Sequence, residues 1–196
     1  AIIDDFTALA RRLEFDPAWT DAFLASMEAD LTRRLYRTEA EMLEYVYGSA
    51  EVIGLYMAKI MRLPAEAQFA AQRLGRAMQV INFIRDAAED AGLGRRYLPL
   101  ERDGVRLLDV PDDWLPSREW AQAHPAEWTA FLRGHLDRYA AWQAEAEAGY
   151  RFIPRRPRMA VRTAGDMYNW TARIIAADPF VVFARQVKPK RARIVL

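Results

Sequence analysis

The amino-acid sequence predicts an all-α protein, and three observations support this prediction. Apolar residues recur every three to four positions through most of the 196 residues, as they do along the buried face of a helix. Helix start signals, such as Asp16 before Pro17, and helix stop signals divide these stretches. The alternating pattern of a strand is absent except weakly at Arg193 to Leu196. We therefore expect about seven or eight helices around a cavity, in a single domain over residues 1–196.

Composition excludes several classes of protein. The net charge is +1, which gives no bulk attraction to nucleic acid, so we expect no nucleic-acid partner. The chain has no cysteine for a disulfide or a thiolate site, and its two histidines, His124 and His135, are too few for a histidine-rich zinc site. No apolar run approaches the roughly 20 residues of a membrane span, and no signal peptide is recognisable. We therefore expect a cytoplasmic protein.

The first two helices follow from apolar spacing and caps. Residues Ile2–Leu13 form the pattern of an amphipathic helix, in which Asp4 and Asp5 fit first-turn partners of the helix dipole better than metal ligands. Asp16 is a favourable N-cap and Pro17 a favourable first residue for a second helix that runs to about Arg34. The residues expected on one face of that helix are Trp19, Phe23, Met27 and Leu31.

A third helix is predicted from Thr38, whose capping-box partner is Glu41, to about Met61. Small residues follow one another along it: Gly48, Ser49, Ala50 and Gly54. Small residues lower helix propensity and are tolerated where a neighbour or a ligand approaches closely. Two interpretations therefore stay open, namely tight packing against another helix and the wall of an apolar channel.

The central helix is predicted from about Pro64 to Gly92, and polar residues occupy one side of it. These residues are Gln79, Asn82, Asp86, Glu89 and Asp90. Because each residue of a helix turns by about 100°, they form one narrow stripe bounded by apolar residues. Burying several carboxylates together is costly unless a cation neutralises them, and an oxygen-rich stripe suits Mg²⁺ and its phosphate ligands. A solvated face is the alternative interpretation.

The residues after this stripe favour the metal-site interpretation. The run GLGRRYLP predicts a helix stop and a rigid turn, which would bring Arg95 and Arg96 to the mouth of the carboxylate-lined helix end. Arginines beside metal-binding carboxylates suit an anionic substrate that carries a polyphosphate.

The remaining elements are predicted in the same way. After a loop over residues 100–116, the sequence predicts a short helix over 116–123, a long helix over 125–150 and a last long helix over 159–177. On the long helix we expect His135 to be a polar residue at the edge of the apolar face. A basic turn over Gly149–Arg158 carries Arg151, Arg155, Arg156 and Arg158. It is interpreted as a solvated loop or as a peripheral contact with anionic lipid headgroups.

The polar stripe and the turn after it resemble the second aspartate-rich motif of the squalene/phytoene synthase family. The family pattern is Q-x-x-N-x-x-R-D-x-x-E-D followed by G-R-x-Y-L-P, and the matching residues are Gln79, Asn82, Arg85, Asp86, Glu89, Asp90, Gly94, Arg95, Tyr97, Leu98 and Pro99. Further family patterns match Asp30, Tyr36, Thr38, Glu41 and Tyr45, then Ala50, Ile53 and Gly54, and later the run AGDMYNWTA that contains Tyr168, followed by Arg185.

This resemblance implies an isoprenoid synthase-type helical bundle around a central hydrophobic cavity. It implies a prenyltransferase that joins two prenyl diphosphates head to head through a cyclopropyl diphosphate, with Mg²⁺ as cofactor and Mn²⁺ as a substitute. Features of the C-terminal part favour geranylgeranyl diphosphate as substrate and phytoene as product, in carotenoid biosynthesis. A carotenoid desaturase would then be a downstream partner.

The resemblance also assigns roles to residues. It implies a metal site made of Asn82, Asp86, Glu89 and Asp90. It implies catalytic roles for Tyr45, Asp86, Asp90 and Tyr168. The substrate-binding residues that it implies are Asp30, Ala50, Ile53, Gly54, Gln79, Arg85, Arg95 and Arg185.

One family feature is absent from the sequence. The first aspartate-rich motif, a DxxxD preceded by an arginine, does not occur, and Asp4 and Asp5 do not replace it because the helix that follows matches a later family segment. The chain begins at Ala1 and its first methionine is Met27. We therefore expect the chain to lack the N-terminal helices of a longer protein and to be inactive alone.

Three other functions stay open at this point. The first is a squalene or dehydrosqualene synthase that uses farnesyl diphosphate. The second is a non-catalytic homologue that acts as a binding or assembly protein. The third is a helical interaction module without a ligand. The intact Asn82, Asp86, Asp90 and Arg95 argue against the second, because a relative that keeps only the fold has no physical reason to retain costly carboxylates. If the third were correct, an apolar replacement of Asp86 would stabilise the protein.

Overall fold

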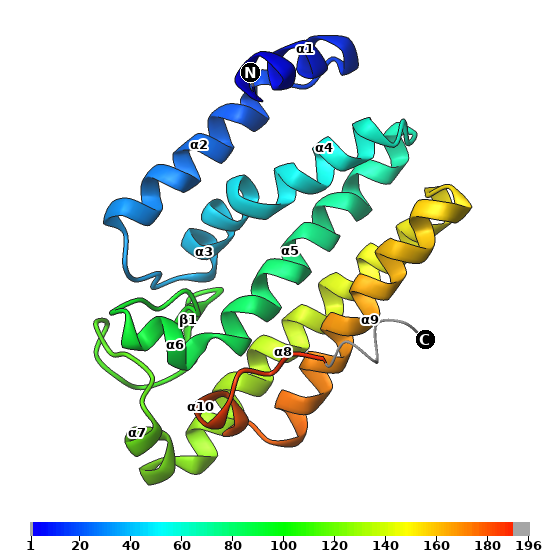
Figure 1. Ribbon diagram of the computed structural model, residues 1–196. Helices are drawn as coiled ribbons and strands as arrows, with labels where there is room; N and C mark the ends of the chain where they lie inside the picture. Colours follow the sequence, from blue (N-terminus) through cyan, green and yellow to red (C-terminus); the bar gives the residue numbers. More distant parts are fainter. Residues whose placement is uncertain (1, 190–196) are drawn as a thin grey trace.

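The computed structural model describes residues 2–189, and helices dominate them (Figure 1). The α-helices are α1 (Ile2–Leu13), α2 (Pro17–Thr32), α3 (Glu39–Val46), α4 (Val52–Ile60), α5 (Gln68–Arg85), α6 (Ala87–Gly92), α7 (Arg118–Ala123), α8 (Pro125–Glu147), α9 (Arg155–Ala177) and α10 (Val181–Ala184). Shorter elements are the π-turn η1 (Tyr47–Glu51), the 3₁₀ turns η2 (Ala65–Ala67) and η3 (Ala148–Phe152), and a hairpin of β1 (Glu101–Arg102) and β2 (Val105–Arg106). The all-α prediction is confirmed.

The helix starts follow the caps that the sequence predicts. Asp16 accepts a hydrogen bond from the amide of Ala18, with Pro17 at the first position of α2. At α3 the Thr38 hydroxyl accepts from the amide of Glu41, and the Glu41 carboxylate accepts from the amide of Thr38. The predicted capping box is therefore present, and it fixes where the chain turns between α2 and α3.

Helix α5 lies at the centre of the bundle. Helix α4 packs along one side of it, and α8 and α9 pack along the other (Figure 1). The main core gathers around α5 and α8, where Ile81, Ile84, Trp128 and Leu132 are fully buried. Helix α5 is therefore packed both against the preceding segment, η1 and α4, and against α8 and α9 from the C-terminal half of the chain.

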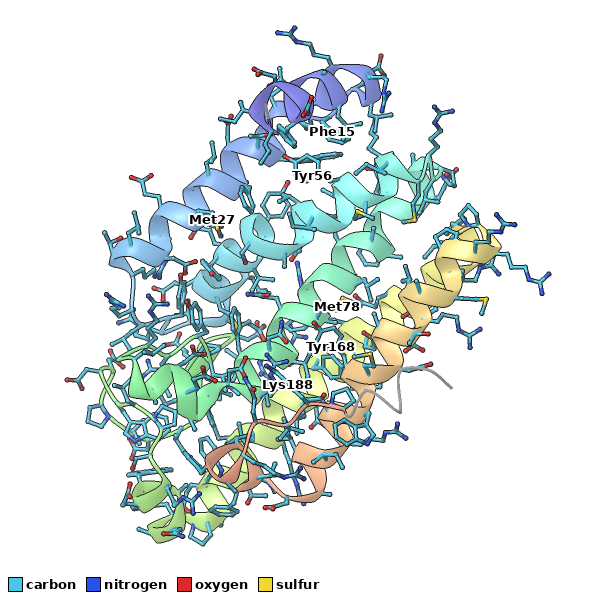
Figure 2. All side chains as sticks on the ribbon, in the orientation of Figure 1. Phe15, Met27, Tyr56, Met78, Tyr168 and Lys188 are labelled. Carbon is cyan, nitrogen blue, oxygen red and sulfur yellow. The ribbon has the colours of Figure 1, made fainter. Side chains whose placement is uncertain are left out.

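A second, smaller core joins the first two helices to α4. It contains Phe15, Trp19 and Tyr56, and Figure 2 shows Phe15 and Tyr56 against each other at a ring-centroid distance of 4.8 Å. Helix α1 has no fully buried residue, so it is held mainly by this aromatic cluster. Leu31, expected on the buried face of α2, is 76% exposed.

Two predicted helices are interrupted in the structure. The helix expected from Thr38 to Met61 contains the π-turn η1, which inserts one residue where Gly48, Ser49 and Ala50 offer little side-chain bulk. The helix expected from Pro64 to Gly92 begins with the 3₁₀ turn η2 and changes direction at Asp86, whose backbone leaves the helical region at φ −96° and ψ 9°.

The loop after α6 holds the hairpin that the sequence did not predict. Glu101 pairs with Arg106 and Arg102 with Val105 around Gly104, which has a φ of +75°. The buried carboxylate of Glu39 accepts hydrogen bonds from Arg102 and from Arg138, so it fastens the hairpin to α3 and α8. The weak strand predicted at Arg193 to Leu196 lies outside the described residues.

Two further expectations on the C-terminal half are wrong. The predicted basic turn is partly helical, because α9 already begins at Arg155; Pro157 is tolerated there, since amides of a first turn need no helical partner. His135 is not an edge residue but is 2% exposed, and the Arg102 guanidinium donates to its Nδ1 at 3.5 Å. Burial and this cation lower the pKa of His135 to about 3, which keeps the ring neutral.

Across residues 2–189, none of the helices combines the length and the apolar character that crossing a membrane requires.

Candidate functional site

The predicted polar stripe lies at the junction of α5 and α6. Although the backbone bends at Asp86, the helical hydrogen bonds continue through it: the Asp86 amide donates to Asn82 at 2.8 Å and the Asp90 amide to Asp86 at 2.8 Å. Asn82, Asp86 and Asp90 therefore keep their spacing of one turn on the same side of the helix. The Asn82 side-chain oxygen is buried and, within residues 2–189, has no hydrogen-bond partner.

The carboxylates of this junction are crowded enough to change their protonation. Burial and the neighbouring charges of Asp86 and Glu89 raise the pKa of Asp90 to about 6, although Arg95 and Arg85 oppose the shift. The Arg85 guanidinium donates to both oxygens of Asp86, at 2.7 and 2.5 Å. These hydrogen bonds raise the pKa of Arg85 and neutralise one of the carboxylates. In the described part of the chain, no arginine forms a salt bridge with Glu89 or Asp90.

The turn after α6 places only one of its two arginines at the site. Gly94 has a φ of +71°, and the amide of Arg95 donates back to the carbonyl of Asp90 at 2.8 Å. Arg95 thereby lies near Asp90, and its buried Nε has no partner among residues 2–189. Arg96, expected beside it, instead points inward and is 2% exposed.

Arg96 is a structural residue of the loop. Its guanidinium donates to the carbonyls of Leu98, Trp114 and Asp112, which closes the loop over residues 96–114. Burial lowers the pKa of Arg96 to about 10, still far above neutrality, so the group stays charged. Carbonyl oxygens can accept hydrogen bonds from an arginine as well as a carboxylate can. Residue chemistry does not separate Arg95 from Arg96, whereas the family pattern G-R-x-Y-L-P does, because it includes Arg95 and leaves the position of Arg96 free.

Three residues from distant segments meet beside the carboxylates. Asp30, at the end of α2, accepts hydrogen bonds from the hydroxyls of Tyr45 at 3.0 Å and Tyr97 at 3.1 Å. Burial raises the pKa of both tyrosines, so both stay protonated and donate. The charges of Asp90 and Arg95 act on Tyr97, which places this tyrosine between Asp30 and the acidic junction. Asp30 and Tyr45 were expected at the site, whereas Tyr97 was matched to the motif without a role.

An aromatic stack supports these tyrosines. The Tyr97 ring stacks on the rings of Phe83 and Tyr36, with centroid distances of 4.4 and 5.4 Å. The centroid of the Tyr45 ring lies 5.4 Å from that of Tyr97. The Tyr36 hydroxyl is buried and has no partner in the described residues. Packing on three sides fixes the two donors to Asp30 in place.

The C-terminal segment closes the other side of the junction. Figure 2 labels Tyr168 on α9 where this helix runs beside α5, and the Tyr168 hydroxyl lies near enough to Arg85 to affect its pKa. Gln186 donates to Glu89 at 3.5 Å, whereas the predicted Arg185 is exposed. Gln186 was not predicted, since a single glutamine after a short helix carries no recognisable pattern. Gln79 is half-buried on α5, three residues before Asn82.

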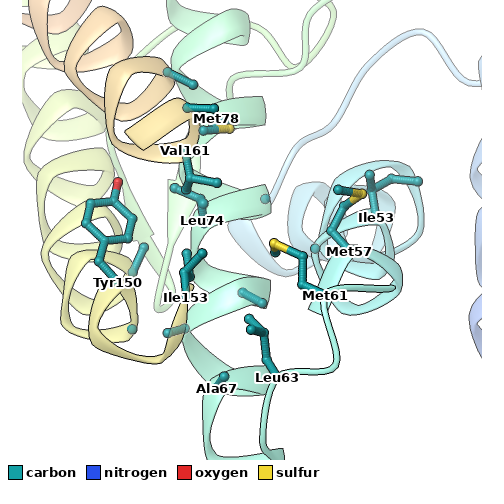
Figure 3. Close-up of a pocket in the computed structure, with 18 of the residues that line it drawn as sticks. Ile53, Met57, Met61, Leu63, Ala67, Leu74, Met78, Tyr150, Ile153 and Val161 are labelled. Atoms are coloured by element: carbon teal, nitrogen blue, oxygen red, sulfur yellow. The ribbon is translucent and has the colours of Figure 1, made fainter. Parts of the chain in front are cut away.

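An apolar pocket continues from the polar junction along α5. Its volume is about 370 Å³, and it lies between α4, α5, η3 and α9 (Figure 3). The predicted residues Ala50, Ile53 and Gly54 line it together with Met78, which lies one turn before Asn82. The pocket is thus apolar along two turns of α5, and the oxygen and guanidinium groups of the junction follow further along the chain. This order suits a ligand with a polar head and an apolar chain.

The small residues Gly48 to Gly54 were interpreted either as a site of tight helix packing or as the wall of an apolar channel. The structure shows close packing beside an apolar pocket, so the two interpretations are compatible. A side chain at Gly54 would collide with the backbone carbonyl of Ala71, and one at Gly75 with that of Ala50. Helices α4 and α5 therefore approach each other through glycine. The same small side chains leave space on the α9 side, where Leu74 and Val161 face the pocket (Figure 3).

The donor set fits a hard cation such as Mg²⁺. Asn82 offers a buried oxygen without a partner, and Asp90 and Glu89 offer carboxylates whose mutual repulsion a cation would relieve. Nevertheless, within residues 2–189 no three acidic or histidine side chains converge closely enough to form a metal site by themselves. A cation here would need ligands from a substrate phosphate, water or another segment.

Comparisons with known proteins agree with this geometry. The family model "Squalene/phytoene synthase" matches residues 1–193. A 15-cis-phytoene synthase of Paracoccus sp. is 33% identical over 166 residues, which cover 83% of this chain and 51% of that protein. A phytoene synthase of Thermus thermophilus is 45% identical over 96 residues, which cover 47% of this chain and 33% of that protein. The chain spans about half the length of the first of these relatives and a third of the second.

Solved structures show the same fold. Squalene synthase HpnC from Alicyclobacillus acidocaldarius superposes with a TM-score of 0.72 at 17% identity, over 87% of this chain and 63% of that chain. A dehydrosqualene synthase solved in complex with a ligand superposes with a TM-score of 0.72 at 21% identity, over 91% of this chain and 61% of that chain. The helical bundle, the motif at the α5–α6 junction and the match over residues 1–193 together show that this chain belongs to the squalene/phytoene synthase family.

Proposed function

We propose that this chain is part of a prenyltransferase that joins two prenyl diphosphates head to head, with geranylgeranyl diphosphate as substrate and phytoene as product. The observation that carries the proposal is the arrangement along α5: the lining of an apolar pocket ends at Met78, Asn82 follows one turn later, and the crowded carboxylates and Arg95 come after it. A prenyl diphosphate likewise has a long apolar chain that ends in a charged head. Curated relatives called phytoene synthase favour the longer substrate.

The residues at the polar end would bind the diphosphate groups. Asn82, Asp86, Glu89 and Asp90 are the proposed ligands of Mg²⁺, or of Mn²⁺ in its place. When bound, the cation would neutralise the diphosphate and make it a better leaving group. Arg95, whose Nε has no partner in the described residues, would donate to the diphosphate. Arg85 would also donate to the diphosphate, once hydrogen bonds to substrate oxygens replace its hydrogen bonds to Asp86.

The tyrosines would act on the hydrocarbon end of the reaction. Loss of diphosphate from one substrate would leave an allylic cation. Attack by the second substrate's double bond and loss of a proton would give a cyclopropyl diphosphate, and loss of its diphosphate, rearrangement and loss of a second proton would give phytoene. The hydroxyl oxygens of Tyr45, held by Asp30, and of Tyr168, near Arg85, would stabilise the cation without reacting with it. The apolar lining from Ala50 to Gly54 would bind the chain and exclude water, with Gln79 at the boundary.

The test is an assay of the full-length gene product with radiolabelled geranylgeranyl or farnesyl diphosphate and Mg²⁺. Asp86→Asn removes one proposed ligand while keeping its shape, and the exposed Asp137→Asn on α8 is the matched control. We expect at least about a 100-fold loss of kcat/KM for Asp86→Asn and no loss for Asp137→Asn.

The product separates the remaining functions. A C40 hydrocarbon from the wild type supports phytoene synthesis. A C30 product assigns the protein to squalene-type synthesis, as the names of the structural neighbours suggest. A folded full-length protein with no product, and no binding of Mn²⁺ with inorganic diphosphate, contradicts the enzyme and favours a non-catalytic homologue.

A further inference from the structure

One end of the bundle combines arginines with exposed apolar side chains. It is formed by the turn between α4 and α5, by η3 and by the start of α9. We call the set Arg62, Phe69, Arg151, Arg155, Arg156 and Met159 the basic tip. Phe69 is 53% exposed and Met159 is 69% exposed, which is unusual for large apolar side chains on a surface this rich in arginine.

These segments are neighbours in space. Leu63, next to Arg62, and Ile153, two residues before Arg155, line the same pocket from opposite sides of α5 (Figure 3). Gly149 of η3 packs against Ala70, the residue after Phe69. The basic tip is therefore one surface, built by two helix turns that are far apart in the sequence.

The arginines of the basic tip have no ion pair among the described residues, although the Arg151 guanidinium lies over the Phe152 ring at 4.7 Å from its centroid. Within residues 2–189 no carboxylate forms a salt bridge with Arg62, Arg151, Arg155 or Arg156. In the sequence, residues 151–159 contain no acidic residue, and residues 61–67 contain only Glu66. Arg158 differs, because it donates to the carbonyls of Ile153 and Arg151 and so stiffens the turn.

We propose that the basic tip docks on an anionic lipid bilayer, with the arginines on headgroup phosphates and Met159 and Phe69 in the interface. Because the basic tip is positively charged, its partner should be anionic. The exposed apolar side chains favour a bilayer over a soluble polyanion. The apolar pocket reaches this tip through Leu63 and Ile153. Docking therefore places the pocket next to the bilayer, where a hydrocarbon can pass without crossing water; only this last step rests on the proposed function.

The test is co-sedimentation of the full-length gene product with vesicles of phosphatidylglycerol and phosphatidylcholine in equal parts, or of phosphatidylcholine alone. Arg155→Glu combined with Arg156→Glu reverses two charges on the tip. Arg11→Glu combined with Arg12→Glu reverses two adjacent exposed arginines of α1 and is the matched control. Circular dichroism checks that both variants fold.

We expect the wild type to bind the anionic vesicles, the tip variant to bind at least about tenfold more weakly, and the α1 variant to bind like the wild type. Met159→Ser should weaken binding roughly threefold at a salt concentration that leaves the arginines partly screened. Absence of binding by the wild type, or an equal loss in both charge variants, would overturn the proposal. Equal binding to double-stranded DNA would also overturn it, because the tip would then be a general polyanion surface. None of these outcomes depends on catalysis, so the proposed function is tested separately.

Discussion

The first half of α5, from Gln68 to Met78, and the acidic junction that follows it, from Asn82 to the turn at Arg95, are stabilised in different ways. The first half is held by close backbone contacts, with Ala71 against α4 and Gly75 against η1, and it lines the apolar pocket. The acidic junction collects carboxylates, and their burial and mutual repulsion raise the pKa of Asp90. Substitutions in the first half should therefore cost stability, whereas substitutions of the acidic residues at the junction should cost function and can add stability. Three predictions test this difference.

The largest expected effect on stability is at the α4–α5 contact. Gly54→Ala places a Cβ against the carbonyl of Ala71 and should lower the free energy of unfolding by about 2 kcal/mol. Gly134→Ala on α8 is the matched control, since nothing lies within 4 Å of the added Cβ. It should raise stability by about 0.5 to 1 kcal/mol, because alanine is the better helix former. Urea denaturation of both variants measures the effects, and a loss at both glycines would contradict the packing argument.

The next effect concerns the acidic junction and depends on pH. The pKa of Asp90 is raised from 3.8 to about 6, so between these values the folded state binds more protons than the unfolded state. Stability should therefore fall as the pH rises through this range. In Asp90→Asn this fall in the free energy of unfolding should be smaller by about 1 kcal/mol, after allowance for solvent screening of a half-buried group.

Unfolding of the wild type and Asp90→Asn at pH 4 and pH 7 measures this contribution. The two proteins should differ at pH 7 and agree more closely at pH 4. A destabilised Asp90→Asn at pH 7 would show that Asp90 is stabilised by its surroundings, contrary to the crowding argument.

The smallest effect distinguishes two stacked tyrosines. Tyr97→Phe removes a donor to Asp30 and should lower stability by about 1 kcal/mol, whereas Tyr36→Phe removes a buried hydroxyl without a described partner and should change it by less than about 0.5 kcal/mol. In the assay of the full-length protein, Tyr97→Phe should also reduce kcat by roughly tenfold, because Tyr45 shares the same carboxylate. Equal effects of the two variants would rule out a positioning role for Tyr97.

The sequence was sufficient to predict the helices and the motif because both depend on local spacing. Apolar periodicity and caps such as Thr38 with Glu41 located the helix starts, and the spacing of Asn82, Asp86 and Asp90 located the acidic stripe. The roles predicted for these residues stay predictions.

The features that were missed depend on long-range contacts. His135 follows an ordinary helical pattern, and its contacts with Arg102 and Pro99 come from the loop after α6, a distant segment that the helical pattern does not reveal. Arg95 and Arg96 are chemically identical neighbours, and carbonyls of residues 98–114 decide which one points inward. The bend at Asp86 coincides with the strong pairing to Arg85, which no propensity scale contains.

The turn that carries Arg95 is also tied to a segment far away in the sequence. The amide of Tyr36 donates to the carbonyl of Arg96, and the amide of Arg96 donates to the carbonyl of Arg34, so the two loops run side by side as a short parallel pair. Helices of this protein can form from local contacts, but this pairing has to close a long loop first. The turn at Arg95 would therefore be among the last parts of the chain to reach its final geometry during folding.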